Sequence, residues 1–284
     1  MDIGIGLPTT LTVGGSTVVD WARRAEQRGF AALATIDRLV YPNYDTITAL
    51  AAAAGATSRI GLFTDILLAP VYQPVWLAKA TGSLHALSGG RLTLGLGVGG
   101  RREDFAAAER SYEDRGRLMD ETLELLHRAW AGEPVAGGRF AVSPPVPGGR
   151  VPVLVGGNGA AAIRRTVRWA DGWTVGGAGV QQAAEFADKV RAAWREADRE
   201  GEPRLAALMY FGLGDDEALA HSLRTYYGWL GETAEYVVRG AARTAEQITE
   251  RARQFAGAGF TDLVLDPTIP SLDQVDRLAD VVLN

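Results

Sequence analysis

The sequence predicts an α/β protein folded as a (β/α)8 barrel, also called a TIM barrel, and three observations support this. About eight short apolar segments alternate along the chain with segments of helical periodicity. The 284 residues are enough for such a barrel, which typically needs about 250. An open doubly wound sheet would instead place a G-x-G-x-x-G turn directly after the first strand, where this chain has Pro8, Thr9 and Thr10.

The expected elements follow from apolar runs, helical periodicity and the residues that end them. Strands are expected at 2–8, 31–36, 59–66, 91–97, 151–155, 172–175, 204–211 and 261–266. Helices are expected at 17–28, 46–57, 75–87, 115–130, 158–170, 180–199, as two helices within 215–239 broken near Gly231, and at 244–256 and 272–283. Ser16 is the expected N-cap of the first helix, and Gly29 is its expected end.

One segment interrupts the alternation of strands and helices. Residues 132–150 are rich in glycine and proline, and we expect a loop with a hairpin there. Because the alternation resumes unchanged afterwards, we predict one domain over 1–284. It would carry an irregular insertion around 132–150 and extra helices around 215–257.

Composition argues against several classes of partner and site. The net charge is −5 and no basic run is present, so neither nucleic acid nor an anionic membrane is an expected partner. Cysteine is absent and the three histidines lie far apart, so we expect no metal site. The start of the sequence shows no secretory pattern and no long apolar segment occurs, so the expected location is the cytoplasm.

Glycines gather at the end of the fourth strand, in the segment SGGRLTLGLGVGG at 88–100. Gly95, Gly97 and Gly99 leave this strand end almost without side chains. Two interpretations follow: a large flat ligand lies against the bare backbone, or backbone packs closely against backbone in a barrel corner.

A second glycine run follows the fifth strand. Gly156, Gly157, Asn158 and Gly159 lie between that strand and a helix that begins with alanines. Free backbone N–H groups and the positive end of a helix form a cradle for phosphate or carboxylate. An ordinary tight turn is the alternative, but the density of glycines favours phosphate.

Active sites of these barrels lie at the C-terminal ends of the strands, which narrows the polar candidates. Thr64 and Asp65 form a polar pair at the end of the third strand, within an otherwise apolar run. Asp37 and Arg38 follow the second strand, and adjacent residues of a strand point in opposite directions. Either of these two lines the site, or both pair with neighbours at the rim.

Three further groups have structural explanations that we favour. The charged residues at 101–104 are expected to form a solvated loop, with one arginine available to an anionic ligand. The three histidines are expected to pack structurally. The aromatic cluster at 226–229 either walls an apolar substrate pocket or packs in the core or a dimer contact, and we favour packing.

Several segments together resemble the bacterial-luciferase-like superfamily of flavin-dependent monooxygenases and F420-dependent oxidoreductases. They are ARRAEQRGF at 22–30, AAAAGATSRIGL at 51–62, PVWLAK at 74–79, SLHALSGGRLTLGLGVG at 83–99, RGRLMDE at 115–121, PVLVGG at 152–157 and ADGW at 170–173. Their order and spacing run through most of the chain and are weakest from 178 to 257.

The resemblance implies a barrel that binds FMN or the deazaflavin F420 at the strand ends. It places a cis non-proline peptide, which bulges against the ring system, at Thr64-Asp65. It further implies that Gly97 and Gly99 flank the ring, and that Gly156, Gly157, Asn158 and Gly159 hold the phosphate.

Two departures from the family pattern bear on the reaction. Many relatives have Asp-His where this chain has Asp37-Arg38, and F420-dependent sugar-phosphate dehydrogenases have an acid where it has Gly100. We therefore expect a monooxygenase that uses O2 and reduced FMN, a loosely bound co-substrate from a separate flavin reductase, to oxidise a small organic substrate. Arg38 and Asp37 are the candidate catalytic residues. F420-dependent hydride transfer and a non-catalytic flavin-binding barrel are the alternatives, and the apolar helices are compatible with a homodimer.

Overall fold

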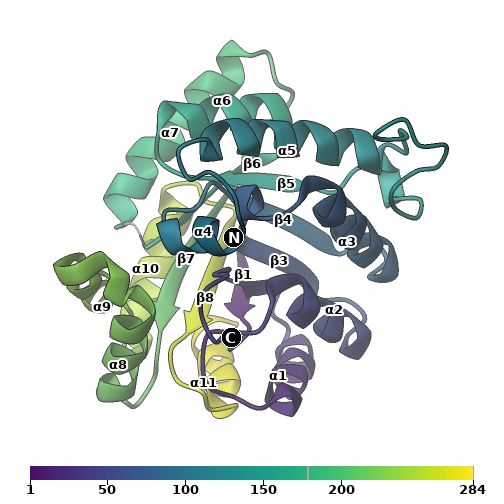
Figure 1. Cartoon of the computed structure of the whole chain (residues 1–284). Coiled ribbons are helices and arrows are strands. Elements are labelled where there is room, and N and C mark those ends of the chain that lie inside the picture. The colour runs from purple at the N-terminus through teal and green to yellow at the C-terminus, as the bar shows by residue number, and fades with distance from the viewer. Residues whose placement is uncertain (178, 284) are drawn as a thin grey trace.

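The computed structural model describes residues 1–177 and 179–283, and it confirms the predicted barrel (Figure 1). Eight parallel strands close into one barrel in sequence order. They are β1 (Asp2–Gly6), β2 (Ala32–Thr35), β3 (Gly61–Leu68), β4 (Leu92–Gly97), β5 (Val153–Gly156), β6 (Gly172–Gly176), β7 (Arg204–Phe211) and β8 (Asp262–Pro267).

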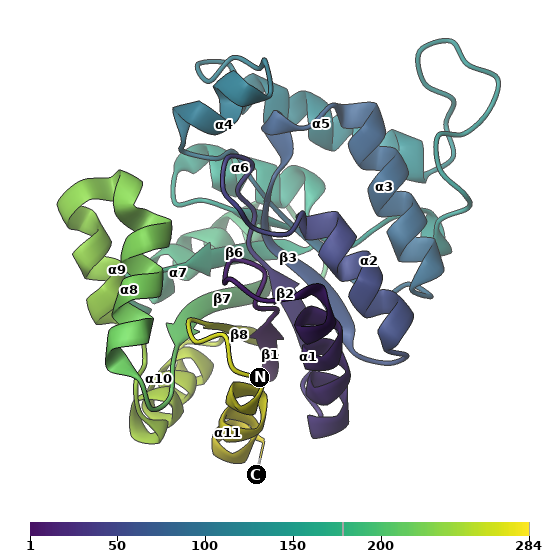
Figure 2. The same cartoon turned by 60° about the horizontal axis from the view of Figure 1, so that its bottom comes forward.

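Helices surround the barrel and cover its outer face (Figure 2). They are α1 (Gly15–Arg28), α2 (Thr46–Ala56), α3 (Pro74–Leu87), α4 (Arg102–Ala107), α5 (Arg115–Trp130), α6 (Ala160–Trp169), α7 (Val180–Glu196), α8 (Asp216–Tyr227), α9 (Ala234–Gly240), α10 (Ala245–Gly257) and α11 (Asp273–Val282). Short 3-10 turns are η1 (Ala69–Val71), η2 (Pro147–Gly149) and η3 (Gly228–Thr233).

Alternation along each strand separates two apolar layers. Outward-facing residues such as Leu33, Leu62 and Trp173 join the large core between barrel and helices. Inward-facing residues form a second cluster inside the barrel, made of Ala34, Phe63, Leu154, Ala206, Leu208, Tyr210 and Val264 with neighbours from α8 and α9. The barrel is therefore packed internally, so it is not an open channel.

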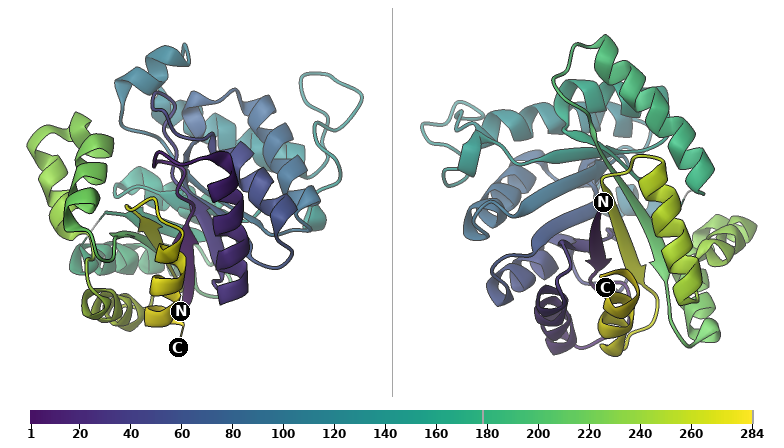
Figure 3. Two further views of the ribbon diagram at one scale, coloured as in Figure 1. Left: turned by 90° about the horizontal axis from the view of Figure 1, so that it is seen from below. Right: turned by 180° about the vertical axis from the view of Figure 1, so that it is seen from behind.

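The closing strands bring the two ends of the chain together. β1 pairs with both β2 and β8, so that Ile5 lies opposite Leu33 on one side and Leu265 on the other. Both ends of the described chain lie on the same side of the barrel (Figure 3). The C-terminal strand ends, and with them the candidate site residues, lie at the opposite end.

Four local predictions were wrong. Gly14 is the N-cap of α1 in place of Ser16, and it makes no side-chain cap bond. The segment around 132–150 contains no strand among its described residues; a loop and η2 replace the expected hairpin. The expected solvated loop after β4 contains the short helix α4, which packs Phe105 inward. β3 continues to Leu68, so Thr64 and Asp65 lie within the strand.

Two other observations concern His85 and the character of the helices. His85 is buried, and its Nδ1 lies 3.1 Å from the Leu92 carbonyl oxygen, which fits the structural role we expected. None of the helices in the described part of the chain combines the length and apolar character that crossing a membrane requires.

Candidate functional site

A cavity of about 910 Å³ opens at the C-terminal ends of the barrel strands. Its size is within the range of ordinary cofactor and ligand sites. Its lining comes from strands β2 to β7 and the loops after them, from α7 and from the α8–α9 segment. It includes Ile36, Asp37, Asp65, Ile66, Leu68, Gly97, Val98, Gly99, Gly100, Arg101, Gly156, Gly157, Asn158, Trp173, Thr174, Lys189, Leu208, Tyr210, Tyr226, Tyr227, Trp229 and Tyr236.

The floor of the cavity contains an irregularity in β3. The peptide bond between Asp65 and Ile66 is cis, and the register of β3 against β4 shifts between Thr64 and Leu67. The resemblance pointed to Thr64-Asp65, one bond earlier. The Ile66 side chain lies beside Gly97 of β4 and Gly156 of β5.

Glycines on β4 and β5 make room for this bulge. A Cβ built on Gly97 would lie 2.1 Å from Ile66 Cδ1, and one on Gly156 would lie 3.0 Å from the same atom. A Cβ on Gly95 would lie 2.1 Å from the Thr64 carbonyl oxygen. Close packing therefore accounts for Gly95, while Gly97 and Gly156 accommodate Ile66 and also line the cavity. Gly99 lines it beyond the strand end.

Asp37 lies at the edge of the cavity in a defined hydrogen-bonding environment. Its carboxylate accepts a bond from the Leu68 backbone N–H at 3.0 Å and from the Tyr72 hydroxyl at 3.0 and 3.1 Å. Burial raises the pKa of Asp37 to about 6, despite these two donors, which lower it. A carboxyl group in this position exchanges a proton near neutral pH.

Arg38 points the other way, as expected for the residue next to Asp37. Its guanidinium donates to the Tyr226 carbonyl oxygen at 2.7 Å and to Glu103 at 2.8 Å. It also lies 4.7 Å from the ring centroid of Tyr41. Arg38 is absent from the described cavity lining.

Arg101 is the arginine that lines the cavity. Its Nε donates to Asp104 at 2.8 Å, and another guanidinium nitrogen donates to the Asp37 carbonyl oxygen at 3.2 Å. The Asp104 side chain is fully buried, and the guanidinium lies 5.5 Å from the ring centroid of Trp229. Arg101 thus connects the β2 and β4 loops to the aromatic side of the cavity.

Asp65 and Asp266 are two further buried acids of the barrel. Asp65 Oδ1 accepts a 2.7 Å bond from the Thr174 hydroxyl, while its Oδ2 is buried without a hydrogen-bond partner among the described residues. Burial raises the pKa of Asp65 to about 7. Burial and then the charge of Asp65 raise the pKa of Asp266 well above its usual range. Burial of both carboxyl groups therefore favours their neutral forms.

The glycine run after β5 lies at one edge of the cavity. Gly157 has φ +113°, a conformation that favours glycine, and its carbonyl oxygen accepts a 2.7 Å bond from the Trp173 indole N–H. Gly159 is the N-cap of α6 and makes no side-chain cap bond. Gly157, Asn158 and Gly159 are exposed, and the first two line the cavity. Backbone donors at this helix start are available to an anion.

Aromatic residues form another wall, and Tyr226 and Tyr227 also pack in the inner apolar cluster, which is the role that we favoured for 226–229. Tyr226, Tyr227 and Trp229 line the cavity together with Tyr210. The Tyr210 and Tyr227 hydroxyl oxygens are 2.5 Å apart, and the Tyr226 and Tyr227 rings pack edge to face at 5.0 Å. Burial raises the pKa of Tyr227 to about 12, so its phenol is neutral at physiological pH.

Sequence reasoning missed several of these residues. Ile66 was hidden in an apolar run, and its only signal was the neighbouring polar pair. Tyr210 and Asp266 were placed within strands without a role, although both lie near strand C-termini. Among the described residues, no group of three or more histidine, cysteine or acidic side chains could hold a metal ion.

Comparison with known proteins identifies relatives of this arrangement. The family model of luciferase-like monooxygenases matches residues 1–266. An F420-dependent hydroxymycolic acid dehydrogenase from Mycobacterium tuberculosis is 29% identical over 228 residues, which is 72% of this chain and 61% of that protein.

Solved structures support the same fold. The monooxygenase RslO1 from Streptomyces bottropensis superimposes with a TM-score of 0.79 and 22% identity, covering 100% of this chain and 99% of that one. An F420-dependent secondary alcohol dehydrogenase in complex with an F420-acetone adduct gives a TM-score of 0.80 and 18% identity, covering 99% and 98%. At these identities the structures establish the shared fold; one of them is a monooxygenase and the other an F420-dependent dehydrogenase.

Proposed function

The chain belongs to the luciferase-like monooxygenase family, and we propose that it uses reduced FMN and O2 to oxidise a small organic substrate. The observation that carries the proposal is the cavity, which has Ile66 on its floor, a glycine cradle at one edge and an aromatic wall. A planar ring system with a phosphate tail matches these three features together. A separate flavin reductase would supply the reduced flavin.

The residues present fit such a group. Ile66 would support the ring, and the backbone at Gly97 and Gly99, which lines the cavity, would lie beside it. Gly157 and Asn158, with the start of α6, would hold the phosphate through backbone N–H groups. The cavity of about 910 Å³ accommodates a cofactor with a small substrate beside it. When bound, reduced flavin supplies the electrons that activate oxygen.

The chain's own groups would prepare the site for this chemistry. Tyr210, Tyr226, Tyr227 and Trp229 would exclude water from the substrate side, because all four line the cavity and the three tyrosine rings pack against one another. Asp37 would hold or release a proton at its carboxyl oxygens, consistent with its pKa of about 6.

Arg38 would act as a positioning residue, since its guanidinium bonds the Tyr226 carbonyl oxygen of that wall. Hydrogen exchange of amides 226–229 tests this role without a substrate. Arg38→Met is expected to accelerate exchange there at least tenfold, while Arg102→Met, which alters an exposed ion pair, leaves it unchanged. Unchanged exchange in Arg38→Met would argue against positioning.

The second candidate is F420-dependent hydride transfer, which needs no oxygen. The identity of 29% to an F420-dependent dehydrogenase over 72% of this chain favours it. Asp37 would then be the group that exchanges a proton with the substrate oxygen. One observation argues against it. The chain has Arg38 where the family pattern would place a histidine, and Gly100 where it would place an acid.

An anaerobic binding experiment separates the candidates. Reduced FMN and F420 are titrated into the purified protein by absorbance, and oxygen is then admitted while its uptake is recorded. We expect tighter binding of reduced FMN and oxygen uptake that substrate increases. A preference for F420 with oxygen-independent turnover would replace this proposal with hydride transfer. Flavin binding with no substrate-dependent turnover would indicate a non-catalytic barrel.

A further inference from the structure

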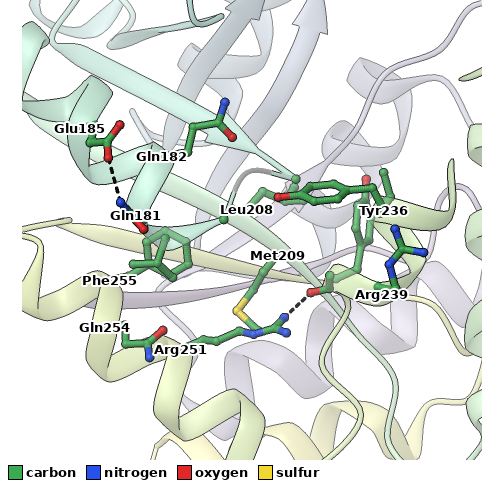
Figure 4. A pocket seen from close by; sticks show the side chains of 16 residues that line it. Gln181, Gln182, Glu185, Leu208, Met209, Tyr236, Arg239, Arg251, Gln254 and Phe255 are labelled. Carbon is green, nitrogen blue, oxygen red and sulfur yellow. Dashed lines mark hydrogen bonds between the residues drawn. The ribbon is translucent and has the colours of Figure 1, made fainter. Parts of the chain in front are cut away.

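A second cavity of about 720 Å³ lies beside the first, between β7 and the helices α7, α9 and α10 (Figure 4). We refer to it as the side chamber. Leu208, Tyr210 and Tyr236 line both cavities, so the side chamber adjoins the candidate site directly. A ligand seated beside the aromatic wall would reach it without crossing the barrel.

The side chamber combines an apolar base with polar walls. Leu208, Met209 and Phe255 are buried and form its apolar surface. Gln181 and Gln182 extend from α7 on one side, and Figure 4 shows Gln181 bonded to Glu185, at 3.1 Å. This hydrogen bond holds the Glu185 carboxylate against α7, the helix that carries it.

Two arginines form the other wall. Figure 4 shows Arg251 extending from α10 past Met209, where it donates to the Gly240 carbonyl oxygen, and Arg239 projecting from α9 nearby. Burial and then the charge of Arg243 lower the pKa of Arg251, which indicates that like charges are crowded there.

Acidic side chains do not neutralise this wall. Within residues 1–177 and 179–283, no carboxylate oxygen lies within 4.0 Å of the Arg239 or Arg251 guanidinium. Arg239 acts on Glu235 at longer range, but that carboxylate is already held by two bonds from Arg224. Arg243 has Asp216 at 4.0 Å. The result is excess positive charge facing an apolar chamber.

We propose that the side chamber binds the acid group, a carboxylate or a phosphate, of an organic ligand whose apolar part lies against Met209 and Phe255. This proposal rests on the proposed function, because it takes the ligand to be the substrate of that reaction. Arg251 and Arg239 would donate charge-assisted hydrogen bonds to the acid. The substrate would then extend from the aromatic wall into the chamber.

Fluorine NMR titration of the flavin-free protein tests the inference. The probes are 4-fluorobenzoate, 4-fluorophenyl phosphate and the neutral 4-fluorobenzamide. At least one acid is expected to bind at least tenfold more tightly than the amide, and the preferred acid identifies the group. Arg251→Met and Arg239→Met should each remove most of this preference. Arg253→Met is the matched control, because Arg253 lies on the same helix, is exposed and pairs with Glu250.

Two outcomes would overturn the inference: equal binding of acids and amide, or an acid preference that neither chamber variant changes. If Arg251→Met fails to fold, Arg239→Met still tests the charge of this wall. Because flavin is absent, failure here with normal FMN binding rejects only the side chamber. Failure of flavin binding with the acid preference intact rejects only the proposed function.

Discussion

Ile66 occupies the space that a side chain at Gly97 would need. A Cβ on Gly97 would lie 2.1 Å from Ile66 Cδ1, well inside van der Waals contact. The two residues lie on adjacent strands, β3 and β4, at the point where the register between those strands shifts. The floor of the candidate site therefore depends on this pair.

Gly97→Ala is expected to displace Ile66 and destabilise the fold by about 1–3 kcal/mol, as overpacking of a core does. FMN affinity should fall as well, because the floor moves. Gly55→Ala is the control: Gly55 lies within α2 with no atom near its Cβ position, and the change should stabilise slightly. Chemical denaturation measures both. This account would be contradicted if Gly97→Ala were as stable as the parent protein and if adding Ile66→Ala to it brought no further stability.

Asp65→Asn is expected to change how stability depends on pH. The pKa of Asp65 rises from 3.8 in the unfolded chain to about 7 in the fold. The folded state therefore binds the additional proton between these values, and this contribution to stability is complete below pH 3.8 and is lost as pH rises to about 7.

The variant avoids this loss, so its stability relative to the parent should improve between pH 3.8 and about pH 7. The upper limit is about 4 kcal/mol, from about 1.4 kcal/mol for each pH unit. Urea denaturation at several pH values measures the difference. A stability difference between the two proteins that is constant across this range would show that Asp65 ionises normally.

Arg101→Met is expected to cost about 3 kcal/mol or more, because it leaves the fully buried Asp104 carboxylate without its cation. Arg102→Met alters an exposed pair with Glu113 and should cost less than about 1 kcal/mol. Thermal denaturation of both variants measures the contrast. Equal costs would mean that the Arg101–Asp104 pair contributes no more than a surface ion pair.

Asn158→Asp adds a negative charge where the phosphate is proposed to bind. We expect FMN affinity to fall at least tenfold, while riboflavin, which has the same ring without the phosphate, binds unchanged. Fold stability should not fall, because an acid near a helix start is favourable.

Gln27→Glu is the matched control for the Asn158 variant. It makes the same charge change at an exposed position of α1, far from Asn158 in the sequence. The binding of both ligands should therefore be unaffected. Flavin fluorescence titration measures the affinities. Equal losses for FMN and riboflavin in Asn158→Asp would place the phosphate elsewhere.

Local patterns were sufficient to predict most elements. The boundaries of α5 at 115–130 and β7 at 204–211 were predicted correctly, because helical periodicity and a continuous apolar run are both local properties. The irregular segments were harder. The hairpin was wrongly expected near 132–150, and α4 was not predicted. Both errors reflect weak local signals in polar, glycine-rich sequence.

The sequence by itself determined the order of strands and helices, and hence which strand ends face the same side of the barrel. It thereby predicted the neighbourhoods of Asp37, Asp65 and Gly157. Tertiary structure decided which atoms meet: Ile66 over Gly97, Arg38 on the Tyr226 carbonyl oxygen, and two unneutralised arginines beside Met209. These contacts join residues from separate strands and helices, so their geometry exists only after the barrel closes.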